Sequence, residues 1–229
     1  VPYLDEKGSV FRAVKKKDIL LHFPYQSFDY LIRFLMEAAF DPKVDEIKIT
    51  QYRVAENSAV INTLVSAAQN GKKVTVFVEL KARFDEENNM STAERMEKAG
   101  IRIIYSIPGL KVHAKVAVII RKDSEDGNKR RDFAYLSTGN FNEKTARVYS
   151  DMALLTCNDE IITDINKVFA VLEGKMSEPT FRHLLVARFN MVPELIRMIH
   201  REIEHVKQGR KGRIVLKMNG LHDQNMINE

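Results

Sequence analysis

The sequence has 229 residues, of which 45% are apolar and 29% are charged, so its composition is that of a folded globular protein, not a disordered chain. The apolar run Val116–Ile120 is far shorter than the ~20 residues that span a bilayer, so we expect no membrane span. A single cysteine, Cys157, excludes an internal disulfide and indicates a reducing compartment, with the cytoplasm as the expected location. The net charge of +5 is compatible with a polyanionic partner but does not require one. Because the first residue is Val1, not Met, we expect the sequence to be part of a longer protein.

Apolar spacing in the first half of the sequence alternates between helical and strand periods. Ser27 can cap a helix over Phe28–Phe40, whose apolar residues share one face. The predicted elements that follow are a strand over 46–52, a helix from Asn57 or Ser58 to Gln69, a strand over 73–80, a helix that the capping box Ser91–Glu94 begins and Gly100 ends, and a strand over 101–105. Helices between strands at this spacing predict βαβ crossovers in a parallel or mixed sheet.

From Lys111 onward, predicted strands follow one another without helices between them. Strands over 112–121 and 132–137 are joined by a polar loop, and a strand over 149–156 precedes a helix over 159–172. Beyond Pro179, a helix over 191–208 and a strand over 213–218 predict the start of a second α/β unit. The predicted fold class is therefore α/β, a mixed sheet flanked by helices with the start of a second unit.

Two residues of the predicted strand over 112–121 combine a nucleophile with a cation. His113 and Lys115 are two apart, so a strand directs both side chains to one face. A neutral imidazole can attack phosphorus, while Lys115 and the amide of Asn140, in the segment Ser137–Asn142, stabilise charge on the phosphoryl oxygens. Gly139 would let backbone approach a ligand closely. The alternative is a buried core histidine beside a solvated lysine.

Two arginines follow two other predicted strands. Arg53 comes after the strand over 46–52, and Arg83 after the strand over 73–80. The carboxyl ends of strands line the ligand crevice of an open α/β sheet, so these guanidinium groups could clamp a phosphate in bidentate fashion. The alternative is a pair of surface salt bridges to Glu56 and Asp85.

These residues carry a family resemblance. The set His113, Lys115, Gly139 and Asn140 resembles the phospholipase D superfamily signature, H-x-K-x4-D with a later glycine–asparagine segment, although Ile120 stands where that signature has aspartate. Longer segments are similar to polyphosphate kinase: I-T-Q-Y-R-V-A-E-N-S (49–58), N-G-K-K-V-T-V (70–76), V-E-L-K-A-R-F-D-E-E (78–87), P-G-L-K-V-H-A-K (108–115) and T-G-N-F-N-E-K-T-A-R (138–147). The residues 20–28 fit the same family.

The resemblance implies a phospholipase D-like fold and an ATP:polyphosphate phosphotransferase. It implies a first catalytic domain over 1–188 and the truncated beginning of a second over 189–229. His113 would take the terminal phosphate of Mg²⁺·ATP as a phosphohistidine and pass it reversibly to inorganic polyphosphate. The implied partners are ATP, ADP and polyphosphate, with no nucleic acid, and the parent protein is expected to be a homo-oligomer.

Three further residues acquire roles from the resemblance. Arg53 and Arg83 match arginines at the family's magnesium site; because a guanidinium is a poor ligand for Mg²⁺, we interpret them as clamps on the phosphates that the metal also holds. Tyr149 follows the N-E-K-T-A-R segment and matches a tyrosine that contacts ATP in the family.

Three functions remain open at this point. Phospholipase D-like sites are built from two halves, each with an H-x-K segment, and the one half that we identify in this sequence is that of His113, so we expect the isolated chain to be weakly active or inactive as a kinase. The second function is a phospholipase D-like phosphodiesterase or nuclease assembled from two copies, against which Ile120 argues. The third is a non-catalytic polyanion-binding or oligomerisation module.

Overall fold

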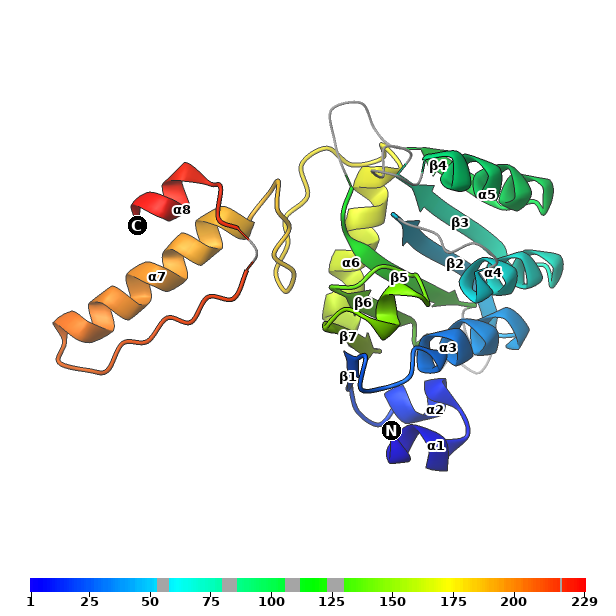
Figure 1. Ribbon diagram of the computed structural model, residues 1–229, viewed down its shortest axis with the longest axis horizontal. Helices are drawn as coiled ribbons and strands as arrows, with labels where there is room; N and C mark the ends of the chain where they lie inside the picture. The colour runs from blue at the N-terminus through cyan, green and yellow to red at the C-terminus, as the bar shows by residue number, and fades with distance from the viewer. Residues whose placement is uncertain (53–57, 80–85, 106–111, 123–129, 219) are drawn as a thin grey trace. The chain divides into compact units, whose positions relative to one another are not determined.

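The computed structural model describes residues 1–52, 58–79, 86–105, 112–122, 130–218 and 220–229 (Figure 1). The chain divides into two units, Val1–Lys175 and Met176–Glu229. The first unit contains the sheet and the helices that cover it. The second contains the amphipathic helix α7, Met191–Lys207, and the short helix α8, Gln224–Asn228. No helix of the described residues is long and apolar enough to cross a bilayer.

The sheet of the first unit has seven strands in the order β1-β7-β6-β5-β2-β3-β4. Its strands are β1 Ile19–Phe23, β2 Val44–Gln51, β3 Lys73–Val78, β4 Arg102–Tyr105, β5 Lys115–Arg121, β6 Phe133–Ser137 and β7 Asp151–Thr156. The strands β2, β3 and β4 run parallel, and the other neighbouring pairs are antiparallel. The predicted mixed sheet is therefore confirmed, with β1 as an added edge strand.

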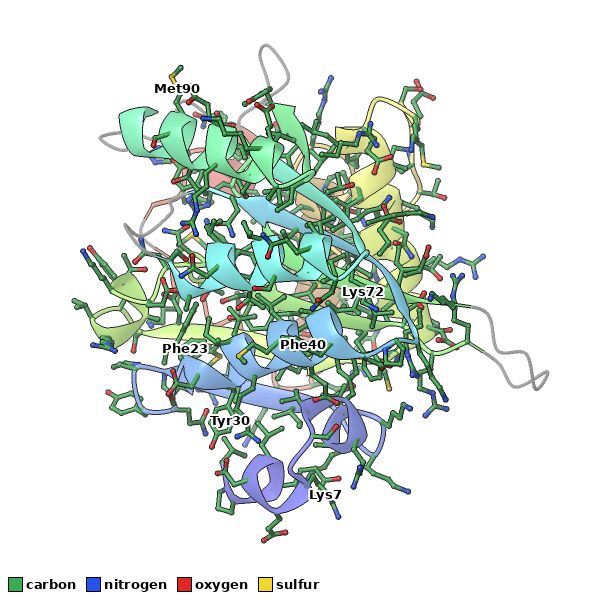
Figure 2. The ribbon with its side chains drawn as sticks, turned by 90° about the vertical axis from the view of Figure 1, so that its right-hand side faces the viewer. Lys7, Phe23, Tyr30, Phe40, Lys72 and Met90 are labelled. Atoms are coloured by element: carbon green, nitrogen blue, oxygen red, sulfur yellow. The ribbon has the colours of Figure 1, made fainter. Side chains whose placement is uncertain are left out.

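Helices cover both faces of this sheet. The helices of the first unit are α1 Pro2–Lys7, α2 Val10–Val14, α3 Asp29–Phe40, α4 Ala59–Gln69, α5 Glu86–Lys98, the 3₁₀ turn η1 Thr145–Arg147 and α6 Asp159–Leu172. Figure 2 shows α3, α4 and α5 side by side across one face, and Figure 1 shows α6 on the other. Apolar residues of α3 and α4, such as Leu35 and Leu64, form one buried core with Ile47 and Ile49 of β2. This burial is the main force that fixes the sheet.

Strand direction brings distant parts of the chain to one edge of the sheet. The strands β2, β3 and β6 end at this edge, whereas β5 and β7 run the other way and begin there. We call it the Lys115 edge; these five strands contribute the terminal residues Gln51, Val78, Lys115, Ser137 and Asp151, and β1 and β4 also end there.

Two predicted elements differ from the structure. The capping box at Ser91–Glu94 is wrong, because α5 begins at Glu86 and Ser91 lies inside the helix. Residues 213–218 do not form the predicted strand; they are exposed and irregular, and no ladder pairs them with any described residue. A strand is stable only where a neighbour takes up its backbone hydrogen bonds. Ser58, in contrast, caps α4 as one of the two predicted candidates. The predicted cap at Ser27 is wrong, because α3 begins at Asp29 with Phe28 as its N-cap, although Ser27 Oγ accepts a hydrogen bond from the Asp29 N–H.

A buried carboxylate ties α6 to the middle of the sheet. Glu173, directly after α6, has a side chain only 1% exposed, and it accepts a hydrogen bond from Lys48 Nζ of β2 at 2.8 Å. Lys175 forms a second ion pair with it. Burial by itself would raise the pKa of Glu173, but hydrogen bonds from Lys175 and Lys48 outweigh it and hold that pKa below its ordinary value of 4.5.

The substitution Glu173→Gln is expected to lower the free energy of unfolding at neutral pH by about 2 kcal/mol, because it replaces charge-assisted hydrogen bonds with neutral ones. The folded-state pKa lies below the unfolded one, so this stabilisation is present at neutral pH and is lost as the pH falls through the folded-state value. Urea unfolding at about pH 7 and about pH 3 measures it.

The matched control for this experiment is Glu6→Gln, since Glu6 is an exposed glutamate of α1. It should change stability little at either pH. An unchanged stability of Glu173→Gln at neutral pH, or an equal loss at both pH values, would contradict the role given to this carboxylate.

Candidate functional site

An exposed histidine and a buried lysine touch at the Lys115 edge. Lys115 Nζ lies 2.9 Å from each ring nitrogen of His113. Lys115 begins β5 and is 5% exposed, whereas His113 lies just before the strand and is exposed. At this distance the ammonium group and the imidazole are in direct contact, and the tautomer of the ring decides which nitrogen accepts. The alternative of a core histidine beside a solvated lysine is wrong, since the burial of the two residues is the reverse.

Tyr52 completes this cluster from the end of β2. Its ring meets the His113 ring edge to face, with centroids 4.8 Å apart and planes at 76°. Lys115 Nζ lies 5.2 Å from the centroid of the same ring, within cation–π range. Tyr52 is a site residue that was not predicted from the sequence. Its position at the end of a strand, directly before Arg53, is the feature of the sequence that could have indicated it.

Buried polar side chains fix the backbone on either side of His113. Glu79, just after β3, accepts a hydrogen bond from the Val112 N–H at 3.1 Å. Thr50 Oγ1 of β2 donates to the Ala114 carbonyl at 2.8 Å and accepts from the Val116 N–H at 3.1 Å. Both side chains are only 2% exposed, so these bonds are shielded from water. His113 is therefore held between two anchored peptide groups, although no strand contains it.

The segment after β6 brings Asn140 to the same edge. Ser137 is paired with Lys115 in the β5–β6 ladder, and half-buried Asn140 follows three residues later. The space beside Gly139 is filled by a side chain: a Cβ there would lie 2.5 Å from Asp151 Oδ2. Asp151 also accepts a hydrogen bond from Thr138 Oγ1 at 2.8 Å. Among the described residues, it is therefore the Asp151 side chain that leaves no room for a larger residue at position 139.

Buried carboxamide atoms at this edge lack hydrogen bonds. Within the described residues, neither Nε2 nor Oε1 of Gln51 has a partner, and the same is true of Asn140 Oδ1. Gln51 is 1% exposed. Continuing the β2–β5 register two residues beyond the Ile49–Ala117 pair places Gln51 opposite Lys115. Unsatisfied buried polar groups are rare and costly, and their presence beside Lys115 is typical of a site that gives up stability for binding or chemistry.

Of the other predicted site residues, one lies at the Lys115 edge and two lie outside the described residues. Tyr149 lies between η1 and β7, at the Lys115 edge, and is 60% exposed. Arg53 and Arg83 lie outside the described residues, as do their alternative partners Glu56 and Asp85. The described residues thus bring together His113, Lys115 and Tyr52, with Asn140 and Tyr149 on neighbouring segments of the same edge.

The described part of the chain offers no protein cage for a metal ion. None of its histidine, cysteine, aspartate and glutamate side chains gather in groups of three or more. Magnesium usually keeps several waters and takes one or two carboxylates together with substrate phosphates. The donor set at the Lys115 edge, a histidine, an ammonium and amides, suits anionic oxygens better than a cation.

Comparison with known families gives two matches that together cover most of the chain. The family described as polyphosphate kinase C-terminal domain 1 matches residues 9–178, and polyphosphate kinase C-terminal domain 2 matches residues 184–229. A polyphosphate kinase of Vibrio vulnificus is 44% identical over 222 residues, which are 97% of this chain and 31% of that protein. The chain thus spans about a third of the length of the curated relatives that it matches.

Solved structures place the fold in the same group. The crystal structure of polyphosphate kinase from Porphyromonas gingivalis is similar with a TM-score of 0.89 and 53% identity, over 99% of this chain and 37% of that one. The phospholipase D family member Nuc from Salmonella typhimurium is similar with a TM-score of 0.54 at 14% identity, over 69% of this chain and 95% of that one. The second similarity concerns the fold alone, which is phospholipase D-like as predicted.

Gln51 and Thr50 form a natural pair for a stability test, because both are buried and adjacent but differ in their hydrogen bonds. Gln51→Leu is expected to raise the free energy of unfolding by about 1 kcal/mol, since it removes a buried amide without partners among the described residues. Thr50→Val is expected to lower it by a similar amount, since it leaves the Val116 N–H without its acceptor. Denaturant unfolding measures both. A loss of stability in Gln51→Leu as large as that in Thr50→Val would show that the amide is satisfied.

Proposed function

Because the chain belongs to the polyphosphate kinase family, we propose that it is part of an ATP:polyphosphate phosphotransferase whose phosphoryl-transfer centre is the Lys115 edge. The observation that carries this proposal is the 2.9 Å contact between Lys115 Nζ and the His113 ring. It places the cation that would balance phosphoryl charge directly beside the ring nitrogens that would attack phosphorus.

The first step forms a phosphohistidine. A ring nitrogen of His113 attacks the γ-phosphorus of Mg²⁺·ATP, and a new N–P bond forms. The bond from this phosphorus to the β,γ-bridging oxygen breaks, and ADP leaves with the electron pair. The reacting groups must be in line, so the anchored peptides on either side of His113, held by Thr50 and Glu79, contribute by limiting the ring's position.

The second step extends the polymer. A terminal oxygen of polyphosphate attacks the phosphorus, the N–P bond breaks, and the electron pair returns to the His113 nitrogen. Each step is reversible, because the N–P bond is labile and the bonds formed and broken are similar in kind. The Lys115 ammonium and the Asn140 amide balance the negative charge on the phosphoryl oxygens as it passes through the transition state.

Arg53 and Arg83 are proposed to hold the phosphates of the nucleotide, and Tyr149 to contact ATP from the exposed segment before β7. Magnesium is proposed to arrive with the nucleotide phosphates, in keeping with the absence of a protein cage among the described residues. Residues 1–188 are proposed as the first phospholipase D-like catalytic domain and 189–229 as the start of the second. The parent protein is proposed to act as a homo-oligomer in the cytoplasm, on nucleotide and polyphosphate and not on nucleic acid.

Incubation of the full-length protein with Mg²⁺ and γ-labelled ATP tests this function. We expect acid-labile, alkali-stable label on the wild type and none on His113→Ala. His200→Ala is the matched control, since His200 is a half-exposed histidine of α7 and should leave labelling unchanged. Equal labelling of wild type and His113→Ala, or no labelling of either, would contradict His113 as the nucleophile.

The isolated 229-residue chain is expected to form polyphosphate at less than about one hundredth of the full-length rate, because it holds one half of a two-half site, that of His113; the other H-x-K tripeptide, His205–Lys207, lies in the helix α7. Polyphosphate formation from ATP at equal molar concentrations of the two proteins measures the difference. A rate equal to that of the full-length protein would show that this chain holds the complete catalytic site.

A further inference from the structure

The carboxylate of Glu143 joins two segments that are distant in sequence. Glu143 lies in the connection between β6 and β7, and its Oε1 accepts hydrogen bonds from the backbone N–H groups of Ala59 at 2.6 Å and Val60 at 3.3 Å. Ser58 Oγ donates to the same oxygen at 3.1 Å. One half-buried side chain thus links the start of α4 to the segment that carries Asn140.

The physical reason for this contact is the free end of α4. The first N–H groups of a helix have no partner within the helix, and its dipole favours a negative charge at that end. The Ser58 hydroxyl is 3.5 Å from one of these groups, that of Ile61, so Glu143 supplies the acceptor for Ala59 and Val60. The bonds of Glu143 are charge-assisted, which makes them stronger and more directional than neutral ones.

Hydrogen bonds and aromatic packing hold the turn around Glu143 together. A shift of the Glu143 side chain would therefore move the adjoining residues of the turn. Asn142 is 8% exposed, and its Oδ1 accepts hydrogen bonds from the N–H groups of Lys144 and Thr145 at 3.0 and 3.1 Å. Phe141 is 2% exposed and packs against Tyr135, with ring centroids 5.4 Å apart. Burial raises the pKa of the Tyr135 hydroxyl above its ordinary value of 10, so this packing partner stays uncharged. Asn140 directly precedes this anchored turn.

We propose that Glu143 is a positioning residue for phosphoryl transfer: its contact with the start of α4 sets the place of the Asn140 segment against that helix, and so the position of the Asn140 amide at the Lys115 edge. The proposal rests on the function proposed above. Glu143 itself touches neither nucleotide nor phosphorus. Its carboxylate accepts hydrogen bonds from the helix end, so it acts by holding the Asn140 segment in one position against α4. Because a misplacement of about 1 Å can reduce a rate by about 100-fold, the effect should fall on the transition state more than on nucleotide binding.

The test uses the full-length protein with Glu143→Ala, Glu143→Gln and Ser58→Ala. Glu143→Ala is expected to lower kcat by about 10- to 100-fold while KM for ATP changes by less than about threefold. Glu143→Gln keeps an acceptor oxygen and should recover most of the loss. Lys144→Ala is the matched control, as the neighbouring side chain is exposed and should leave kcat unchanged.

A double-mutant cycle separates positioning from simple loss of stability. Ser58→Ala should lower kcat modestly in the wild type and have no further effect in Glu143→Ala, where the contact is already removed, because the two side chains act through one contact. Equal, independent effects of the two substitutions would overturn the proposal. A wild-type kcat in Glu143→Ala would also overturn it, whatever the change in melting temperature. If Glu143→Ala does not fold, Ser58→Ala alone decides, and a wild-type kcat in that variant would overturn the proposal.

The failure of this proposal and that of the proposed function are distinguishable. If the wild type carries no label on His113, the function itself is wrong. If the wild type is labelled and turns over while Glu143→Ala does so equally well, only the positioning role is wrong.

Discussion

The site depends on a lysine buried beneath an exposed histidine. Taking an ammonium group out of water is costly unless its donors find partners, and Lys115, at 5% exposure, meets the His113 nitrogens and the Tyr52 ring. The same contact holds a cation against the ring nitrogens of an exposed histidine. In the proposed function, the histidine is the nucleophile and the buried cation balances the charge of the transferred phosphoryl group.

The directions of the strands bring the residues of this site together. A mixed sheet lets β2, β3 and β6 end where β5 and β7 begin, so five separate parts of the sequence meet at one edge. Three carboxylates then fix the parts: Glu79 holds the peptide before His113, Glu143 holds the Asn140 segment to α4, and Glu173 holds α6 to β2. Each lies on a different connection, so loss of one should leave the other two contacts intact.

The sequence predicts the fold where one element has a strong local pattern. The strand at 46–52, the helix after Ser58 and the helix at 159–172 all follow from periodicity and capping residues, and the structure has them within a few positions. Short elements were missed: α1, α2 and β1 have five or six residues each, too few to display a period. His113 and Lys115 were identified by residue type and spacing. Glu79, Thr50 and Glu143 were not, because a buried polar side chain is recognisable only once its backbone partners, distant in sequence, are known.

The central claim is that His113, above the buried Lys115, carries the transferred phosphoryl group. Its most direct test is to react the full-length protein with Mg²⁺·ATP, digest it at alkaline pH, where phosphohistidine survives, and locate the added phosphate by mass spectrometry. The account predicts a phosphoryl group on His113, in the peptide that contains Lys115. A phosphoryl group on another residue, or an unmodified His113 in a protein that still turns over ATP, would contradict it.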